Sequence, residues 1–174
     1  ETDKSVTIRF EVPQDLKTTF AFKAGQYITL KAEINGNEIR RDYSLCSSPK
    51  SEELKVAIKE VDGGAFSIFA NNELRVNDVL EVAPPNGRFI FEPNHNMSRT
   101  IASFAAGSGI TPIMSIVKTV LEEEPNSNLV LVYGNKTSKD TIFHNKLLEL
   151  QAKYINRFFV QFVFSQSEEE NALF

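Results

Sequence analysis

The periodicity of apolar residues in this chain changes once, at the polar stretch 93–98, and that change constrains the fold more than any other feature. Before it, apolar and polar residues alternate in short runs such as Val6 to Val12 and Ile28 to Ile34. This period is typical of strands with one buried face. After it, apolar runs alternate with segments whose apolar residues recur at helical spacing. We therefore expect two domains, over 1–94 and 99–174.

The first half consists of short strands separated by turn residues, which favours a small antiparallel β-barrel or sandwich. Asn35-Gly36 predicts a tight hairpin turn between strands at 28–34 and 39–45. Further strands are expected at 6–12, 54–58 and 79–82, and a helix at 65–72.

Strands and helices alternate in the second half, and this order implies right-handed crossovers and a parallel sheet. Three expected strands make only one half of a doubly wound nucleotide-binding domain. We therefore expect an incomplete α/β domain that belongs to a longer protein. The expected strands span 100–106, 129–133 and 158–164, and the expected helices span 112–124 and 139–154.

Charge and composition exclude several classes of function. The net charge of -4 argues against a nucleic-acid partner, which would need a basic face. Neither a membrane-length apolar run nor a signal peptide is recognisable, so we expect a cytoplasmic protein with no membrane partner. Cys46 is the single cysteine, so we expect no metal site and no internal disulfide, and we interpret Cys46 as a small packed side chain.

Arg41-Asp42-Tyr43-Ser44 joins a fixed cation, a phenol and a hydroxyl within a few positions of a predicted strand. Strand alternation places Arg41 and Tyr43 on one face, which suits a cofactor that carries phosphate and an aromatic ring. Gly63-Gly64 before the predicted helix could hold an anion on free backbone N–H groups. Taken singly, both segments also fit an ordinary exposed strand and an ordinary loop.

Gly107-Ser108-Gly109-Ile110-Thr111-Pro112 lies between a predicted strand and a predicted helix, and it departs from the dinucleotide fingerprint by ending in proline. We predict Thr111 as the N-cap and Pro112 as the first helical residue. The two glycines would let a pyrophosphate approach the backbone closely. The alternative is a tight turn that needs glycine for its shape alone.

Together these segments resemble the ferredoxin-NADP reductase superfamily over nearly the whole chain. Arg41 to Ser44 is similar to its Arg-x-Tyr-Ser motif, and Gly64 to Ser67 to its Gly-x-x-Ser segment. Pro85 to Phe89 resembles the end of its flavin barrel. The stretches 41–49 and 58–61 are most similar to the reductase components of multicomponent oxygenases, especially the phenylacetyl-CoA type.

The resemblance implies FAD, rather than FMN, on the barrel. Arg41 would contact the flavin phosphates, Tyr43 would pack on the isoalloxazine, and Ser44 would hydrogen-bond near its N5 atom. The other flavin contacts that it implies are Gly64, Phe66 and Ser67 at the pyrophosphate and the backbone of Ala57, Ile58 and Lys59 on the ribityl and adenine side.

The resemblance also implies NADH or NADPH as the electron donor on the second domain. Gln166 follows Ser165 where NADPH-preferring relatives often carry arginine, and glutamine lacks that charge, which favours NADH. Tyr43, Ser44 and Thr111 would act at the reacting rings. The residues that would contact the nicotinamide nucleotide are Gly107, Ser108, Gly109, Thr111, Pro112, Tyr133, Gly134, Asn135 and Ser165.

The predicted function is hydride transfer from NAD(P)H to FAD, followed by single-electron transfer to an iron-sulfur centre that serves an oxygenase, as in phenylacetate-type aromatic degradation. A 2Fe-2S cluster would lie outside this segment, in a further domain or a ferredoxin, because one cysteine cannot hold it. Without the distal part of the nucleotide domain, residues 1–174 alone are expected to bind flavin but to reduce it poorly. The alternatives are a non-catalytic flavin-binding or electron-transfer subunit and a non-redox β-barrel that binds a small ligand.

Overall fold

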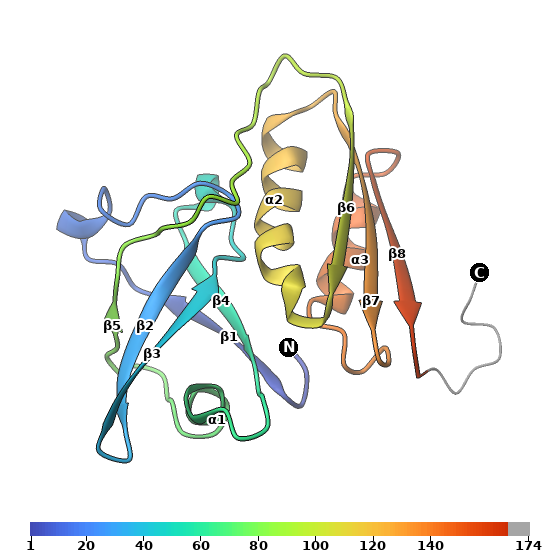
Figure 1. The fold of residues 1–174 in the computed structure, drawn as a ribbon. Helices are drawn as coiled ribbons and strands as arrows, with labels where there is room; N and C mark the ends of the chain where they lie inside the picture. Colours follow the sequence, from blue (N-terminus) through green and yellow to red (C-terminus); the bar gives the residue numbers. More distant parts are fainter. Residues whose placement is uncertain (167–174) are drawn as a thin grey trace.

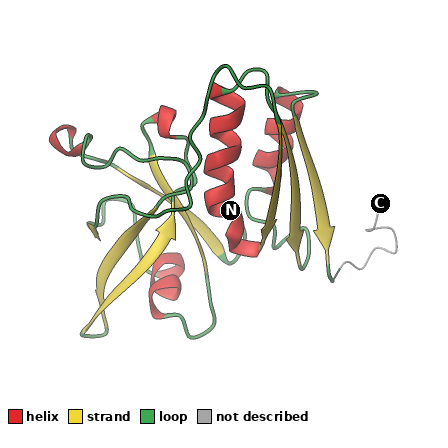
Figure 2. Cartoon of the chain, turned by 45° about the horizontal axis from the view of Figure 1, so that its top comes forward, coloured by secondary structure: helices red, strands yellow, loops and turns green. Residues whose placement is uncertain are grey.

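The computed structural model describes residues 1–166 and places the two halves side by side, joined by a linker that passes over the top of the view in Figure 1. The N-terminal half is antiparallel, and the C-terminal half is a parallel sheet with helices on one side (Figure 2). The predicted fold class is confirmed.

The N-terminal half forms two small antiparallel sheets among the described residues. Strand β1 pairs with β4, and β2 lies between β3 and β5, while a bridge between Leu45 and Val56 joins the two sheets. Alternating apolar residues such as Ile28 and Leu30 are fully buried between them. The elements are β1 (Ser5–Phe10), η1 (Gln14–Leu16), β2 (Tyr27–Ile34), β3 (Asn37–Ser44), η2 (Pro49–Ser51), β4 (Leu54–Lys59), α1 (Ala65–Asn72) and β5 (Glu81–Val82).

The hairpin between β2 and β3 turns at Asn35 and Gly36, whose φ angles of 52° and 73° suit the tight two-residue turn that the sequence predicts. Its register sets Arg41 opposite Leu30 and Tyr43 opposite Ile28. Arg41 and Tyr43 therefore share one face of the sheet.

The C-terminal half is a sheet in the order β6-β7-β8, paired in parallel throughout. Helices α2 and α3 cover the face of this sheet that is turned toward the barrel (Figure 1). Within residues 1–166, no helix has the length and apolar character needed to cross a membrane. The elements are β6 (Thr100–Ala106), η3 (Gly107–Gly109), α2 (Ile110–Glu123), β7 (Asn128–Asn135), α3 (His144–Lys153) and β8 (Phe158–Phe164).

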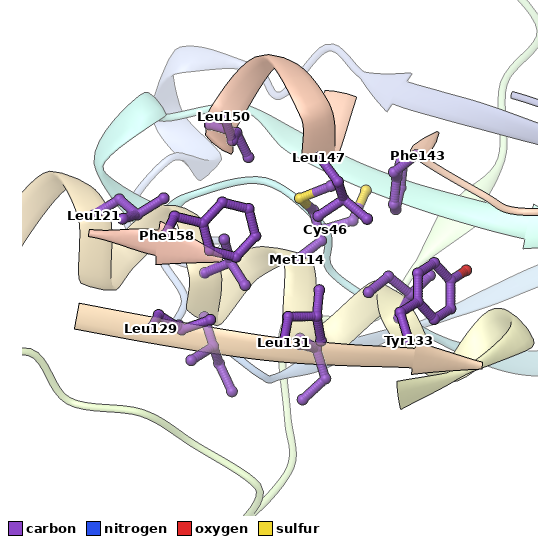
Figure 3. Close-up of a cluster of buried hydrophobic side chains, with 14 of the residues drawn as sticks. Cys46, Met114, Leu121, Leu129, Leu131, Tyr133, Phe143, Leu147, Leu150 and Phe158 are labelled. Atoms are coloured by element: carbon purple, nitrogen blue, oxygen red, sulfur yellow. The ribbon is translucent and has the colours of Figure 1, made fainter. Parts of the chain in front are cut away.

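One hydrophobic core extends across both halves. Ala24, Cys46 and Ala57 of the N-terminal half pack in the same cluster as side chains from α2, β7, α3 and β8. In Figure 3 the labelled side chains gather around Cys46 and Met114. Burial raises the pKa of the Cys46 thiol to about 11, so Cys46 is a packed apolar group, as predicted.

The linker is anchored at the far end of α2 by the fully buried Glu124. Its carboxylate accepts bonds from the Arg99 guanidinium at 2.6 and 3.1 Å, from the Asn94 N–H at 2.9 Å and from the Ser127 hydroxyl at 2.8 Å. Burial alone would raise the pKa of Glu124, but these donors outweigh it and the pKa lies below the ordinary value.

Several predicted boundaries differ from the observed ones by two residues or more: β1 ends at Phe10, β3 begins at Asn37, β7 ends at Asn135, and three further elements differ as follows. The predicted strand 79–82 shrinks to Glu81–Val82, and Val79 is 93% exposed. Helix α3 begins five residues late, because Thr137 and Thr141 form a hydrogen-bonded turn and Phe143 has a φ of 62°. Helix α2 begins two residues early, at Ile110.

Candidate flavin and nicotinamide site

A pocket of about 460 Å³ opens between the barrel and the start of α2. One wall comes from β3, β4 and the segment 61–67, and the other from the loop 107–112. We call these the barrel wall and the α2 wall. The predicted site residues that line the pocket are Arg41, Tyr43, Ser44, Ala57, Lys59, Gly64, Phe66, Ser67, Ser108, Gly109, Thr111 and Pro112.

Arg41 and Tyr43 give the barrel wall its charge and its aromatic surface. No carboxylate among the described residues pairs with Arg41, whereas its neighbour Arg40 pairs with Glu38 at 2.8 Å. The Tyr43 ring is half-buried, and its centroid lies 5.5 Å from that of the fully buried Phe66 ring. Burial raises the pKa of the Tyr43 phenol. This wall therefore offers an uncompensated cation beside a braced, neutral aromatic ring.

Gly64 closes a tight loop at the start of α1. A Cβ there would lie 2.6 Å from Ser67 Oγ and 3.0 Å from the Val61 carbonyl oxygen, so a larger residue would force the loop to shift. The Ser67 hydroxyl donates to the Gly64 carbonyl at 3.0 Å and accepts from the Val61 N–H at 3.0 Å. Ser67 thus shapes the loop from within, and its hydroxyl is engaged by the chain itself.

The α2 wall includes the backbone of a glycine loop. Gly107 has a φ of 50°, and a Cβ on Gly107 or Gly109 would meet nothing within 4 Å, so this backbone is approachable. The predicted capping role of Thr111 is wrong, because Gly109 is the N-cap and makes no side-chain bond. The Thr111 hydroxyl instead donates to the Ser108 carbonyl at 3.1 Å, which tightens the loop.

The remaining predicted residues do not line the pocket. Ile58 is fully buried in the barrel core, as the backbone role predicted for it allows. The Tyr133 ring is also fully buried, and its hydroxyl donates to the Gly107 carbonyl at 2.9 Å, so Tyr133 supports the loop from behind. Gly107 itself, Gly134, Asn135 and Ser165 lie at the carboxyl end of the parallel strands.

Asn135 places an amide at this edge, near the Tyr133 phenol: burial raises the pKa of Tyr133, and the Asn135 side chain opposes that shift. The Asn135 side chain is buried, at 9% exposure, and neither of its polar atoms has a hydrogen-bond partner in the part of the chain that the structure describes. Ser165 donates to the Asn135 backbone carbonyl from its N–H at 3.0 Å and from its hydroxyl at 3.5 Å. Because buried polar groups are nearly always paired, an orphaned amide beside a glycine loop fits a nucleotide.

Sequence reasoning missed two residues of the barrel wall, Asp42 and Val61. Asp42 lies between Arg41 and Tyr43 in β3, and its carboxylate accepts a hydrogen bond from Thr29 Oγ1 at 2.6 Å. Val61 follows β4 in a turn, where no pattern indicated a role.

The barrel, the α/β half and the pocket that they share define a two-domain arrangement suited to a flavin on one side and a nicotinamide nucleotide on the other. A family model described as "Oxidoreductase FAD-binding domain" matches residues 2–91, and one described as "Oxidoreductase NAD-binding domain" matches residues 104–173. The chain belongs to the ferredoxin-NADP reductase superfamily and consists of its FAD-binding and NAD-binding domains.

Named relatives agree with this membership. The chain is 42% identical over 99% of its length to one subunit of the 1,2-phenylacetyl-CoA epoxidase of Escherichia coli, and it covers 49% of that subunit. It is 36% identical over 90% of its length to the ferredoxin reductase component of the 3-ketosteroid-9-alpha-monooxygenase of Rhodococcus rhodochrous, of which it covers 44%. The chain thus spans about half the length of these relatives.

A solved structure shares the fold. The flavohem-like FAD/NAD-binding domain of nitric oxide dioxygenase from Vibrio cholerae superposes with a TM-score of 0.83 at 21% identity, over 99% of this chain and 73% of that one. At this identity the likeness concerns the arrangement of the two domains.

Proposed function

We propose that the protein to which this chain belongs is the reductase component of an oxygenase system. It takes a hydride from NAD(P)H, passes it to FAD and delivers single electrons to an iron-sulfur centre. The observation that carries the proposal is that one pocket holds the unpaired Arg41 on its barrel wall and an open glycine loop on its α2 wall. The two relatives described above are named as components of an epoxidase and of a monooxygenase.

The bound flavin would supply the hydride acceptor, and the nicotinamide the donor. Arg41 neutralises phosphate charge, Tyr43 presents its ring as a platform, and the Ser44 hydroxyl offers a hydrogen bond to a ring nitrogen. Gly64 and the first turn of α1 accommodate the flavin pyrophosphate, and Ala57, Ile58 and Lys59 line the ribityl and adenine side. These residues bind and orient the reacting groups and exclude water from between them.

The loop 107–112 holds the nicotinamide nucleotide on the opposite wall. Gly107 and Gly109 leave room for its pyrophosphate, and Thr111 lies on the pocket side, near the nicotinamide ribose. The orphaned Asn135 amide, with Gly134 and Ser165, completes the contacts at the sheet edge. Gln166 brings no charge for an extra phosphate, which favours NADH over NADPH.

Electron delivery requires a partner group. Cys46, the single cysteine, is buried in the shared core, so the 2Fe-2S cluster belongs to a further domain or to a ferredoxin, with oxygenase subunits beyond it. Similarity to the component of the epoxidase favours phenylacetyl-CoA chemistry as the process served. The cytoplasmic location stays a prediction of the sequence.

Reconstitution of the protein to which this chain belongs, rather than of residues 1–174 alone, with FAD, followed by anaerobic addition of NADH, tests the proposal. We expect the absorption bands of a bound flavin and then their loss as NADH reduces it. A flavin that binds but stays oxidised would instead indicate a non-catalytic flavin subunit. If no flavin binds after reconstitution, the barrel serves a different ligand and the proposal is wrong.

A further inference from the structure

One stripe of α2 makes polar contacts with the segment that continues β3. Ser115, Lys118 and Glu122 are spaced three and four residues apart and so lie on one face of the helix. Together with Cys46–Ser48 they form what we call the interdomain clamp. Its hydrogen bonds run from Ser115 Oγ to the Ser47 carbonyl at 2.7 Å, from Lys118 Nζ to the Cys46 carbonyl at 2.8 Å, and from Ser48 Oγ to Glu122 Oε2 at 2.5 Å.

The barrel side of the clamp is itself fixed. The Cys46 N–H donates to the Lys55 carbonyl at 2.8 Å, and the Ser47 hydroxyl donates to the Glu53 carbonyl at 2.5 Å and accepts from the Lys55 N–H at 3.2 Å. Ser47 and Ser48 are each only 2% exposed. The clamp therefore connects α2 to a segment that cannot move independently of β4.

The clamp lies directly behind the pocket on both walls. Ser44 precedes Cys46 by two residues on the barrel side, and Thr111 precedes Ser115 by one helical turn on the other. Both Ser44 and Thr111 line the pocket. Any slip of α2 along the barrel would change the separation of the two walls.

The apolar core alone would not prevent such a slip. Cys46 and Met114 pack in a cluster of aliphatic and aromatic side chains, whose hydrophobic attraction carries little directional preference. A half-buried ammonium costs desolvation energy, which lowers the pKa of Lys118, and an apolar side chain there would avoid that cost. What the hydrogen bonds add is one defined position of the helix.

We propose that Ser115, Lys118 and Glu122 are positioning residues that set the distance between the barrel wall and the α2 wall of the pocket. This inference rests on the proposed function, since its consequence is the rate of hydride transfer. Such transfer requires close approach of the reacting atoms, and a displacement of about 1 Å can lower a rate about a hundredfold.

The test compares Lys118→Met and Ser115→Ala with Lys153→Met, which makes the same change on exposed Lys153 of α3. In the FAD-loaded protein to which this chain belongs, we expect each clamp variant to slow flavin reduction at saturating NADH by about tenfold, with flavin content and the NADH KM nearly unchanged. Lys118→Arg should restore most of the rate, because a guanidinium can donate to the same carbonyl. Lys153→Met should behave as wild type.

Small-angle X-ray scattering of the flavin-free protein gives a readout that needs no activity. A larger radius of gyration in the clamp variants, absent in Lys153→Met, is the expected result. Unchanged reduction rates and unchanged scattering in Lys118→Met and Ser115→Ala would overturn the proposal. If those variants fail to fold, Glu122→Ala at the exposed end of the stripe, which removes the acceptor of the Ser48 hydroxyl, decides by the same two measurements. If NADH does not reduce the flavin of the wild-type protein, the proposed function is wrong. The scattering comparison does not depend on that reaction and still tests whether the clamp positions α2.

Discussion

The two walls of the pocket recognise ligands by different means. The barrel wall presents side chains, the Arg41 guanidinium and the Tyr43 ring, on strands whose register is set by paired backbone bonds. The α2 wall presents backbone at Gly109, and the adjoining Gly107 is held from behind by the Tyr133 hydroxyl. Side-chain recognition should fail when one charge is removed, whereas backbone recognition should fail when a Cβ is added.

The largest expected effect is on the barrel wall. Arg41→Ala removes the uncompensated cation and should weaken FAD retention by about ten- to a hundredfold, since charge-assisted hydrogen bonds contribute about 1.5–3 kcal/mol. Arg40→Ala is the matched control, because Arg40 is the adjacent exposed arginine and pairs with Glu38. Flavin content after desalting, measured by absorption, distinguishes them. Equal retention in the two variants would show that Arg41 does not contact the phosphates.

A smaller effect is expected where α2 ends. Glu124→Gln weakens the buried contacts to Arg99 and should lower the free energy of unfolding by about 1–3 kcal/mol. Because the folded-state pKa of Glu124 is depressed, its contribution is complete above the ordinary value of 4.5 and is lost as pH falls through the folded value. Urea unfolding between pH 3 and 7 should therefore show a smaller acid dependence in the variant. An identical acid dependence would contradict the assignment.

The next smaller effect is expected on the α2 wall. Gly107→Ala places a Cβ at a φ of 50°, a strain of about 1 kcal/mol, and should raise the NADH KM about fivefold while leaving FAD retention intact. Gly36→Ala is the control, since Gly36 has a φ of 73° and equally open surroundings in the distant hairpin. If both variants bind NADH equally, the loop 107–112 does not recognise the nucleotide through its backbone.

The sequence predicted those features of the fold that depend on local patterns, and it did not predict those that depend on contacts between distant segments. Period-two runs placed the barrel strands, and the bounds of α1 agree with the predicted helix 65–72, because alternation and helical spacing are local properties. The late start of α3 depended on the turn around Thr137, where side-chain bonds compete with the helix. That Ala24 and Cys46 would pack with α2 depended on the contact between halves, which no local pattern encodes.

The candidate site shows the same limit. Arg41, Tyr43 and the glycine loop were predicted because motifs carry their chemistry in short stretches. The interdomain clamp was not predicted, because Ser115 and Lys118 have the spacing of any ordinary helix face. Asn135 was named for its place after β7, but only the structure shows that its amide is buried without a partner.

The smallest expected effect concerns Cys46, which packs in the shared core and lines neither wall of the pocket. With a pKa of about 11, only about a thousandth of this thiol is ionised at pH 8, so alkylation by iodoacetamide should be slow in the folded protein and fast in urea. Cys46→Ala should leave FAD retention unchanged. Rapid labelling of the folded protein would show that the shared core opens readily.

Hydrogen exchange with FAD and NAD+ added in turn tests most directly whether two ligands occupy opposite walls of one pocket. FAD should slow exchange of backbone amides in 41–44 and 64–67, and NAD+ added to the FAD-loaded protein should slow exchange in 107–111. Protection of neither wall by FAD, or no further protection of 107–111 by NAD+, would contradict the account.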